Sequence, residues 1–95
     1  MLAYNQKKFL IVDDFSDFRS SVRSMLRELG VVEVDTADTG EQALLMCAQK
    51  RYDFILHDFN FGDGKKNGQQ VLEDLMTDKL ISHEGVFVMV TAENS

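Results

Sequence analysis

The sequence predicts an α/β domain in which a parallel sheet carries helices on both faces. Short apolar runs of strand length alternate along the chain with stretches whose apolar residues recur at helical spacing, which predicts the order βαβαβαβ. Two of the runs, FLIV and VFVMV, are continuous, as is typical of strands covered on both faces. Strands separated by helices need crossover connections, and such connections give a parallel sheet.

The first half of the chain contains two predicted strands and two predicted helices. Residues 9–12 form the first strand, and apolar residues from Phe15 to Leu29 then recur at helical spacing until a glycine offers a stop. Apolar and polar residues alternate over residues 31–37, which predicts a second strand. Thr39, followed three residues later by Gln42, has the form of a capping box and opens the second helix.

The second half continues the alternation. Residues 54–57 form the third strand, and residues 85–90, GVFVMV, form the fourth. Between them a third helix follows Gly68. Its predicted apolar positions are Val71, Leu72, Leu75 and Met76. Met25, Met46 and Met76 are interpreted as packing residues and Cys47 as a small core residue.

Composition limits the functions that the chain can have. Ninety-five residues, of which 44% are hydrophobic and 27% charged, suit one small globular domain, and we expect a single domain over residues 1–95. A formal net charge of −6 disfavours nucleic acid and suits a cation or a basic partner. A lone Cys47 and a short N-terminal apolar run predict a cytoplasmic protein without disulfide, signal peptide or membrane span.

Polar residues follow three of the four predicted strands. Asp13 and Asp14 follow the first strand, Asp58 the third and Thr91 the fourth. The ligand site of an open parallel sheet lies beyond the carboxyl ends of its strands, so we expect these side chains to meet. Carboxylates at such short separations repel one another and therefore need a counter-ion. Oxygen-only ligands that leave room for water and phosphate predict magnesium rather than zinc.

Each of these acids also has a structural interpretation. Asp13 and Asp14 could cap the following helix, although Ser16 can supply that cap instead. Asp58 could be a turn residue in the loop rich in Asp, Asn and Gly. His57 should point to the opposite face from Asp58 and be buried or capped rather than catalytic. The joint placement of the acids at strand ends favours a site.

Three motifs, FLIVDDFSDFR, YDFILHDFN and FVMVTAEN, occur in this order across almost the whole chain. They resemble those of response regulator receiver domains, the flavodoxin-like modules of two-component signalling, of the chemotaxis-regulator type. The resemblance implies that Asp58 accepts a phosphoryl group and that Asp13 and Asp14 hold Mg²⁺ beside it. It further implies that Asn60 offers a backbone carbonyl to the metal and that Thr91 is the switch hydroxyl. The implied donor is a sensor histidine kinase or a histidine phosphotransfer protein.

The chain departs from the family pattern in two places. The loop after Asp58 is longer than usual and has Gly62 where the family usually has proline. The sequence also stops after the fourth strand, so the last helix, the fifth strand with its lysine, and the final helix are lacking. We therefore expect an incomplete flavodoxin-like sheet whose exposed fourth strand supports self-association.

Two other functions fit part of the pattern. A pseudo-receiver that is never phosphorylated would act as an interaction or dimerisation module, and the lacking lysine is the argument for it. A haloacid-dehalogenase-like phosphatase would use Asp58 as a nucleophile, but such enzymes have a second aspartate where Asn60 stands. We expect that the chain is not an enzyme and that it at most assists its own phosphorylation and dephosphorylation.

Overall fold

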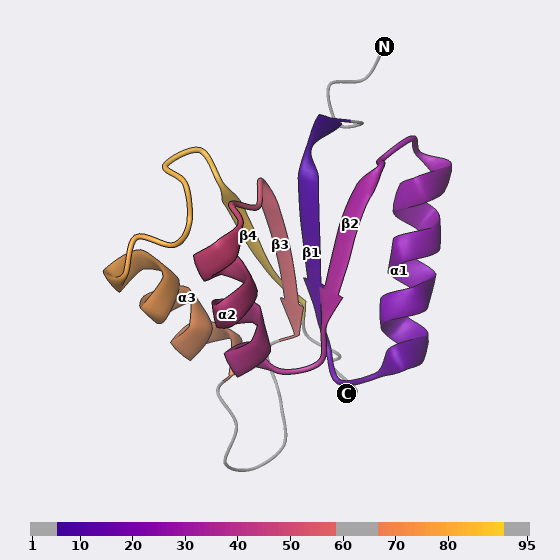
Figure 1. Ribbon diagram of the computed structural model, residues 1–95. Coiled ribbons are helices and arrows are strands. Elements are labelled where there is room, and N and C mark those ends of the chain that lie inside the picture. Colours follow the sequence, from indigo (N-terminus) through magenta and orange to yellow (C-terminus); the bar gives the residue numbers. More distant parts are fainter. Residues whose placement is uncertain (1–5, 59–66, 91–95) are drawn as a thin grey trace.

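The computed structural model describes residues 6–58 and 67–90, and these form the predicted βαβαβαβ order (Figure 1). The elements are β1 (Lys8–Val12), α1 (Ser16–Glu28), β2 (Glu33–Ala37), α2 (Gly40–Gln49), β3 (Phe54–Asp58), α3 (Gly68–Thr77) and β4 (Val86–Val90). Within the described ranges, no helix is both long enough and apolar enough to span a bilayer.

The strands form one parallel sheet in the order β2-β1-β3-β4. Helix α1 covers one face, and α2 and α3 cover the other (Figure 1). The predicted fold class is therefore confirmed. Strand β1 lies between β2 and β3, with Val12 beside both Ala37 and His57, so the carboxyl end of β1 is central in the sheet.

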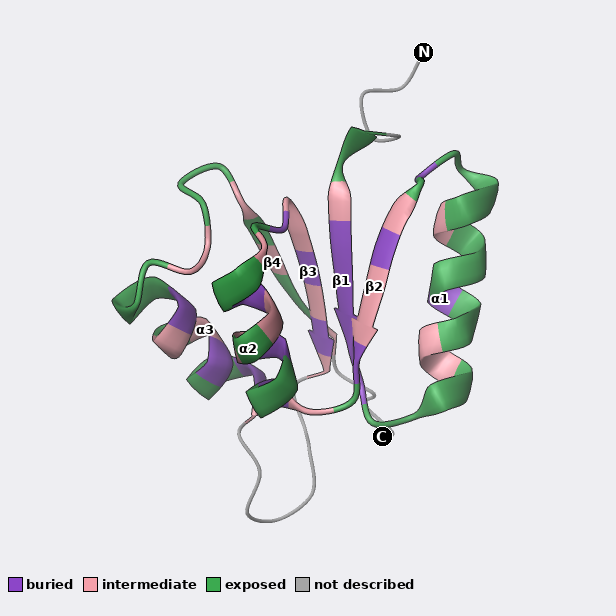
Figure 2. Cartoon of the chain, in the orientation of Figure 1, coloured by how far each residue is buried: buried purple, intermediate pink, exposed green. Residues whose placement is uncertain are grey.

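Two apolar cores lie on the two faces of the sheet because side chains alternate along each strand. The core beneath α2 and α3 is built on Leu10, Val12, Ala37, Ala43, Cys47, Tyr52, Ile55, Val71 and Leu75. The core beneath α1 is built on Phe9, Ile11, Val22, Val31 and Val34. Strand β1 contributes to both, and Figure 2 shows it buried along most of its length. Cys47 is a core residue, as predicted.

Four apolar residues that the helical spacing assigned to packing lie at the surface. Phe15 is 71% exposed, Met25 58%, Leu29 64% and Met76 64%, so these predictions were wrong, whereas Met46 packs against the core as expected. On its face of the sheet, α1 is the one helix among the described residues, and its sole buried residue is Val22. Because no other described helix lies beside α1 on this face, its flank meets solvent.

The capping box predicted at the start of α2 is half formed. Thr39 Oγ1 accepts from the Gln42 backbone N–H at 3.1 Å, but the Gln42 side chain accepts from the backbone N–H of Asp38 rather than of Thr39. A complete capping box opens α3 instead, where Asn67 and Gln70 bond reciprocally at 2.9 Å. Both helices therefore have defined starting points close to the carboxyl edge of the sheet.

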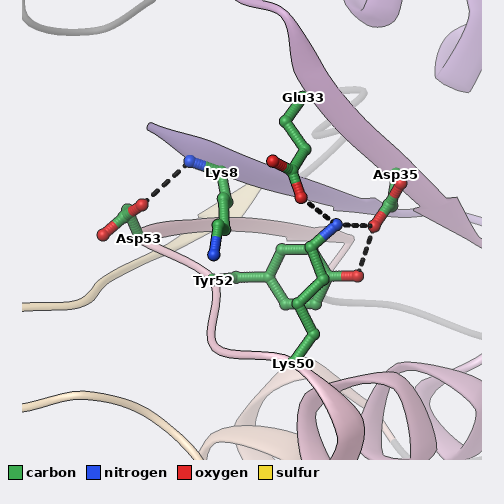
Figure 3. A network of polar contacts seen from close by, with 6 residues as sticks. All are labelled: Lys8, Glu33, Asp35, Lys50, Tyr52 and Asp53. Atoms are coloured by element: carbon green, nitrogen blue, oxygen red, sulfur yellow. Dashed lines mark hydrogen bonds and ion pairs between the residues drawn. The ribbon is translucent and has the colours of Figure 1, made fainter. Parts of the chain in front are cut away.

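Strand β2 forms one edge of the sheet and is lined with charge (Figure 3). Lys50, which follows α2, pairs with both Glu33 and Asp35. The Tyr52 hydroxyl donates to Asp35 at 2.6 Å, and Lys50 Nζ lies 5.3 Å from the Tyr52 ring centroid. The ion pairs with Glu33 and Asp35 raise the pKa of Lys50, so this edge keeps its charges at neutral pH.

Candidate metal centre

Asp13, Asp14 and Asp58 come together at the carboxyl edge of the sheet. Each has a carboxylate oxygen within 4.8 Å of those of the other two. The acids come from the ends of adjacent strands, because β1 delivers Asp13 and Asp14 while β3 ends at Asp58. The sequence-based prediction that these three side chains meet is therefore correct.

The three acids differ in burial, and Asp13 is held by hydrogen bonds. Asp13 is 6% exposed, Asp58 is half-buried and Asp14 is exposed. The Asp13 N–H donates to Ala37 O at 3.1 Å, and its carboxylate Oδ1 accepts from the Phe15 N–H at 2.8 Å. Its backbone and one carboxylate oxygen are thus fixed, and among the described residues none donates a hydrogen bond to the second oxygen. Such a carboxylate is positioned before a ligand arrives.

The start of α1 corrects one prediction. Ser16 does not cap the helix, because the N-cap is Phe15 and no side chain bonds there. The Asp13 carboxylate takes the Phe15 N–H instead, one residue before the helix begins. Asp13 therefore has part of the structural role that the alternative interpretation gave it, while it still belongs to the acidic cluster.

Arg19 contributes a contact that the sequence did not suggest. Its Nη1 donates to the Asp13 carbonyl at 2.6 Å, six residues back along the chain. The guanidinium lies on the first turns of α1 and is partly buried. An arginine within two turns of an acidic strand end is the one signal that the sequence offers for this contact.

A cavity of about 310 Å³ opens beside the acids. It is lined by Asp13, Phe15, Asp17, Phe18, Asp58 and Val90. One part of the wall is therefore carboxylate and the other is apolar. With three acids on its wall, the cavity favours cations, and its volume has room for a phosphoryl group together with water.

His57 lies behind the site rather than in it. The ring is fully buried, its Nδ1 lies 2.6 Å from the Asp58 carbonyl, and it stacks on Phe87 with centroids 5.7 Å apart. Burial lowers the pKa of His57, although the Asp58 carbonyl and the Asp13 charge act in the other direction. The prediction of a buried histidine is confirmed, and the ring packs beneath the strand end that carries Asp58.

Gly68 allows α3 to begin close to the same strand end. A Cβ at this position would lie 3.3 Å from the Asp58 carbonyl oxygen and 3.3 Å from the Met89 side chain. A larger residue would push α3 away from β3 and β4. Asn60, Gly62 and Thr91, for which the sequence also made predictions, lie outside the described residues.

Comparison with known proteins agrees with this geometry. The family model of the response regulator receiver domain matches residues 9–95. The chain belongs to this family. Receiver domains are signalling modules of response regulators rather than classical enzymes.

The relatives of this receiver domain include chemotaxis regulators. It is 38% identical over 86 residues to chemotaxis protein CheY-3 of Vibrio cholerae serotype O1, which covers 90% of this chain and 64% of that protein. The chain thus spans slightly less than two thirds of the length of this relative.

Two solved structures of response regulators have a fold similar to that of this chain. Chemotaxis response regulator CheY4 of Vibrio cholerae superposes with a TM-score of 0.81 at 29% identity, covering 94% of this chain and 71% of that one. TrrA of Thermotoga maritima, solved in complex with Mg²⁺ and BeF, gives a TM-score of 0.78 at 28% identity over 94% of this chain and 72% of that one.

Proposed function

We propose that this receiver domain accepts a phosphoryl group on Asp58, with Mg²⁺ held by Asp13, Asp14 and Asp58. The observation that carries the proposal is the cluster itself, in which three carboxylates lie within 4.8 Å beside a cavity of about 310 Å³. Hard oxygen donors with space for water and phosphate suit Mg²⁺. The complex of TrrA with Mg²⁺ and BeF supports the same choice of metal.

The chemistry follows from the positions of the acids. A carboxylate oxygen of Asp58 attacks the phosphorus in line with the leaving group, and its new O–P bond forms as the bond to the donor breaks. The electron pair of the broken bond leaves with the donor. Mg²⁺, when bound, neutralises the charge that gathers as phosphoryl oxygens approach the acids. Asp13 is already fixed by the Phe15 N–H and by Arg19, so it need not reorganise.

Two further roles rest on the sequence motifs alone. We assign the backbone carbonyl of Asn60 to the metal, and the Thr91 hydroxyl to reading the phosphoryl group through a hydrogen bond. Val90, the residue before Thr91, lines the cavity and pairs with Asp58 across the sheet.

The proposed donor is phosphohistidine on a sensor histidine kinase or a histidine phosphotransfer protein. Phe15 is 71% exposed and borders the cavity together with Phe18, so it offers an apolar contact close to Asp58. Aromatic side chains of this kind contribute strongly to protein interfaces. A cytoplasmic location stays a prediction, as does a single domain over residues 1–95. We also propose that the chain associates with a second copy of itself through β4.

The test is incubation with acetyl phosphate, with and without Mg²⁺, followed by intact mass measurement. We expect a gain of one phosphoryl group that needs Mg²⁺ and that Asp58→Asn abolishes. Asp38→Asn, which follows β2 outside the acidic cluster, is the matched control and should keep the gain. No gain by a chain whose circular dichroism is that of a folded protein would favour the non-phosphorylated interaction module.

A further inference from the structure

Arg19 holds the turn between β1 and α1, at the carboxyl edge of the sheet (Figure 1), through both its backbone and its side chain. Its backbone N–H donates to the Phe15 carbonyl at 3.1 Å, and its Nη1 donates to the Asp13 carbonyl at 2.6 Å. The Asp13 carboxylate in turn accepts from the Phe15 N–H at 2.8 Å. These three bonds join Asp13, Phe15 and Arg19 into a closed cycle, so each residue restrains the other two.

Sheet pairing and helix capping support this turn only in part. The pairing of β1 with β2 ends at Val12 and Ala37, and beyond it the Asp13 N–H donates to Ala37 O at 3.1 Å. The N-cap of α1 is Phe15, whose side chain accepts no hydrogen bond. The Asp13 carbonyl thus lies after the end of the paired strand and before the start of the helix, and it takes its hydrogen bond from the Arg19 guanidinium.

The bond from Arg19 to Asp13 belongs to the stronger class of hydrogen bonds. A guanidinium keeps its charge at every pH at which proteins are folded, and a charged donor makes a shorter and stronger bond than a neutral one. Asp13 is 6% exposed and Arg19 is partly buried, so water competes weakly for this carbonyl. Without its donor, the carbonyl would stay unsatisfied or turn toward water, and the Asp13 side chain would turn with it.

We propose that Arg19 is a positioning residue that fixes the Asp13 carboxylate for Mg²⁺. The inference rests on the proposed function for the identity of the metal, and Arg19 acts on the metal only through Asp13. The cycle holds this carboxylate within 4.8 Å of those of Asp14 and Asp58 before a metal arrives. Mg²⁺ demands near-ideal geometry, so a ligand that must first be ordered binds it less tightly.

The charge of Arg19 and its hydrogen bond predict opposite effects on Mg²⁺ binding. A positive charge close to the acids repels a divalent cation, so removing that charge should lower the Kd for Mg²⁺. Losing the hydrogen bond releases Asp13 and should raise the Kd. The sign of the change therefore separates positioning from electrostatics.

Calorimetry of Mg²⁺ binding measures this sign. Arg19→Met removes the guanidinium and keeps an unbranched side chain, and Arg23→Met, one turn later at an exposed position of α1, is the control that loses the same charge. We expect the Kd for Mg²⁺ to rise about tenfold in Arg19→Met and to stay equal or fall in Arg23→Met. With acetyl phosphate, the half-saturating Mg²⁺ concentration should rise likewise, whereas the rate at saturating Mg²⁺ should stay within about twofold.

Hydrogen exchange in EDTA tests the cycle without metal or phosphate. The Phe15 amide should exchange at least about tenfold faster in Arg19→Met than in the unmodified chain, and Arg23→Met should leave its rate unchanged. The amide of Ile11, in the buried middle of β1, is the internal reference and should change by less than about twofold. Equal acceleration of both amides would mean a loss of overall stability and would overturn the inference.

The unmodified chain offers a readout that needs no variant to fold. By ¹⁵N NMR, the Arg19 guanidinium should rotate about its Nε–Cζ bond at least about fivefold more slowly than that of exposed Arg23, because the Asp13 carbonyl holds one Nη group. Equal rotation rates would overturn the inference, as would a Kd for Mg²⁺ in Arg19→Met that does not exceed that of Arg23→Met.

The two proposals fail in different experiments. Absence of phosphoryl transfer to Asp58, together with the expected exchange and rotation rates, would refute the proposed function and leave the positioning of Asp13 by Arg19 standing. Phosphorylation of Asp58 with the same Mg²⁺ dependence in Arg19→Met and Arg23→Met would overturn the role of Arg19 alone.

Discussion

Asp14→Asn should make the metal-free protein more stable. Unit charges at 4.8 Å, the upper limit of the separations in the acidic cluster, repel by about 0.9 kcal/mol even at the dielectric constant of water. Asp14 forms two such pairs, one with Asp13 and one with Asp58. Removing its charge therefore relieves about 1.7 kcal/mol at low ionic strength. With a urea dependence of about 1.5 kcal/mol per molar, the unfolding midpoint should rise by about 1 M.

Magnesium should stabilise the unmodified protein more than it stabilises Asp14→Asn. If the site binds Mg²⁺ with a Kd of about 1 mM, 10 mM stabilises the unmodified protein by about 1.4 kcal/mol. Asp14→Asn removes one of the three clustered carboxylates, so Mg²⁺ should add little to its stability. The variant is then the more stable protein in EDTA, and most of this advantage is lost in Mg²⁺.

Urea unfolding followed by circular dichroism, once in EDTA and once in Mg²⁺, measures both effects. Glu84→Gln is the matched control, because it changes the net charge equally at an exposed position in the turn before β4. An Asp14→Asn midpoint equal to that of Glu84→Gln in EDTA, together with an unchanged response to Mg²⁺, would refute the electrostatic reasoning.

Three further predictions concern the fold. Leu75→Ala should cost about 3 kcal/mol of unfolding free energy and Met76→Ala less than about 0.5, because Leu75 is fully buried and Met76 is exposed; equal urea midpoints would contradict this. Burial acts to raise the pKa of Asp35, but hydrogen bonds from Tyr52 and Lys50 outweigh it, so the pKa is lowered on folding. Asp35 therefore stabilises the fold at pH values above its unfolded pKa, and this stability is lost as the pH falls through the folded pKa. After allowance for the exposure of Asp35, Tyr52→Phe should lower the free energy of unfolding by about 1 kcal/mol at pH 7. The difference in stability between the variant and the unmodified chain should narrow below about pH 4 in acid-unfolding curves, and a constant difference would contradict the prediction. The thiol of Cys47 should react with a disulfide reagent only after urea unfolds the chain, and fast reaction of the folded protein would be inconsistent with its burial.

The acidic cluster could be predicted from sequence because it depends on topology alone. Continuous apolar runs identify the strands, the intervening helices make the sheet parallel, and the carboxyl ends of parallel strands share one edge. Asp13, Asp14 and Asp58 follow such runs directly, so no knowledge of packing was needed.

Features that depend on neighbouring elements could not be predicted in this way. Helical spacing identifies Met25 and Met76 as apolar positions but does not say whether another element covers them. The sequence offered Asp13, Asp14 and Ser16 as caps of α1, but the N-cap is Phe15, and the Asp13 carboxylate accepts the Phe15 N–H just before the helix begins. The contact from Arg19 to the Asp13 carbonyl likewise requires the course of the chain between β1 and α1.

The central claim is tested most directly by locating the acyl phosphate. Borohydride reduces aspartyl phosphate to homoserine, which tandem mass spectrometry places in the sequence. After treatment with acetyl phosphate, we expect reduction at Asp58 that requires Mg²⁺ and is weaker in Asp14→Asn. Reduction at another aspartate, or none at Asp58 in a folded chain with Mg²⁺ present, would contradict it.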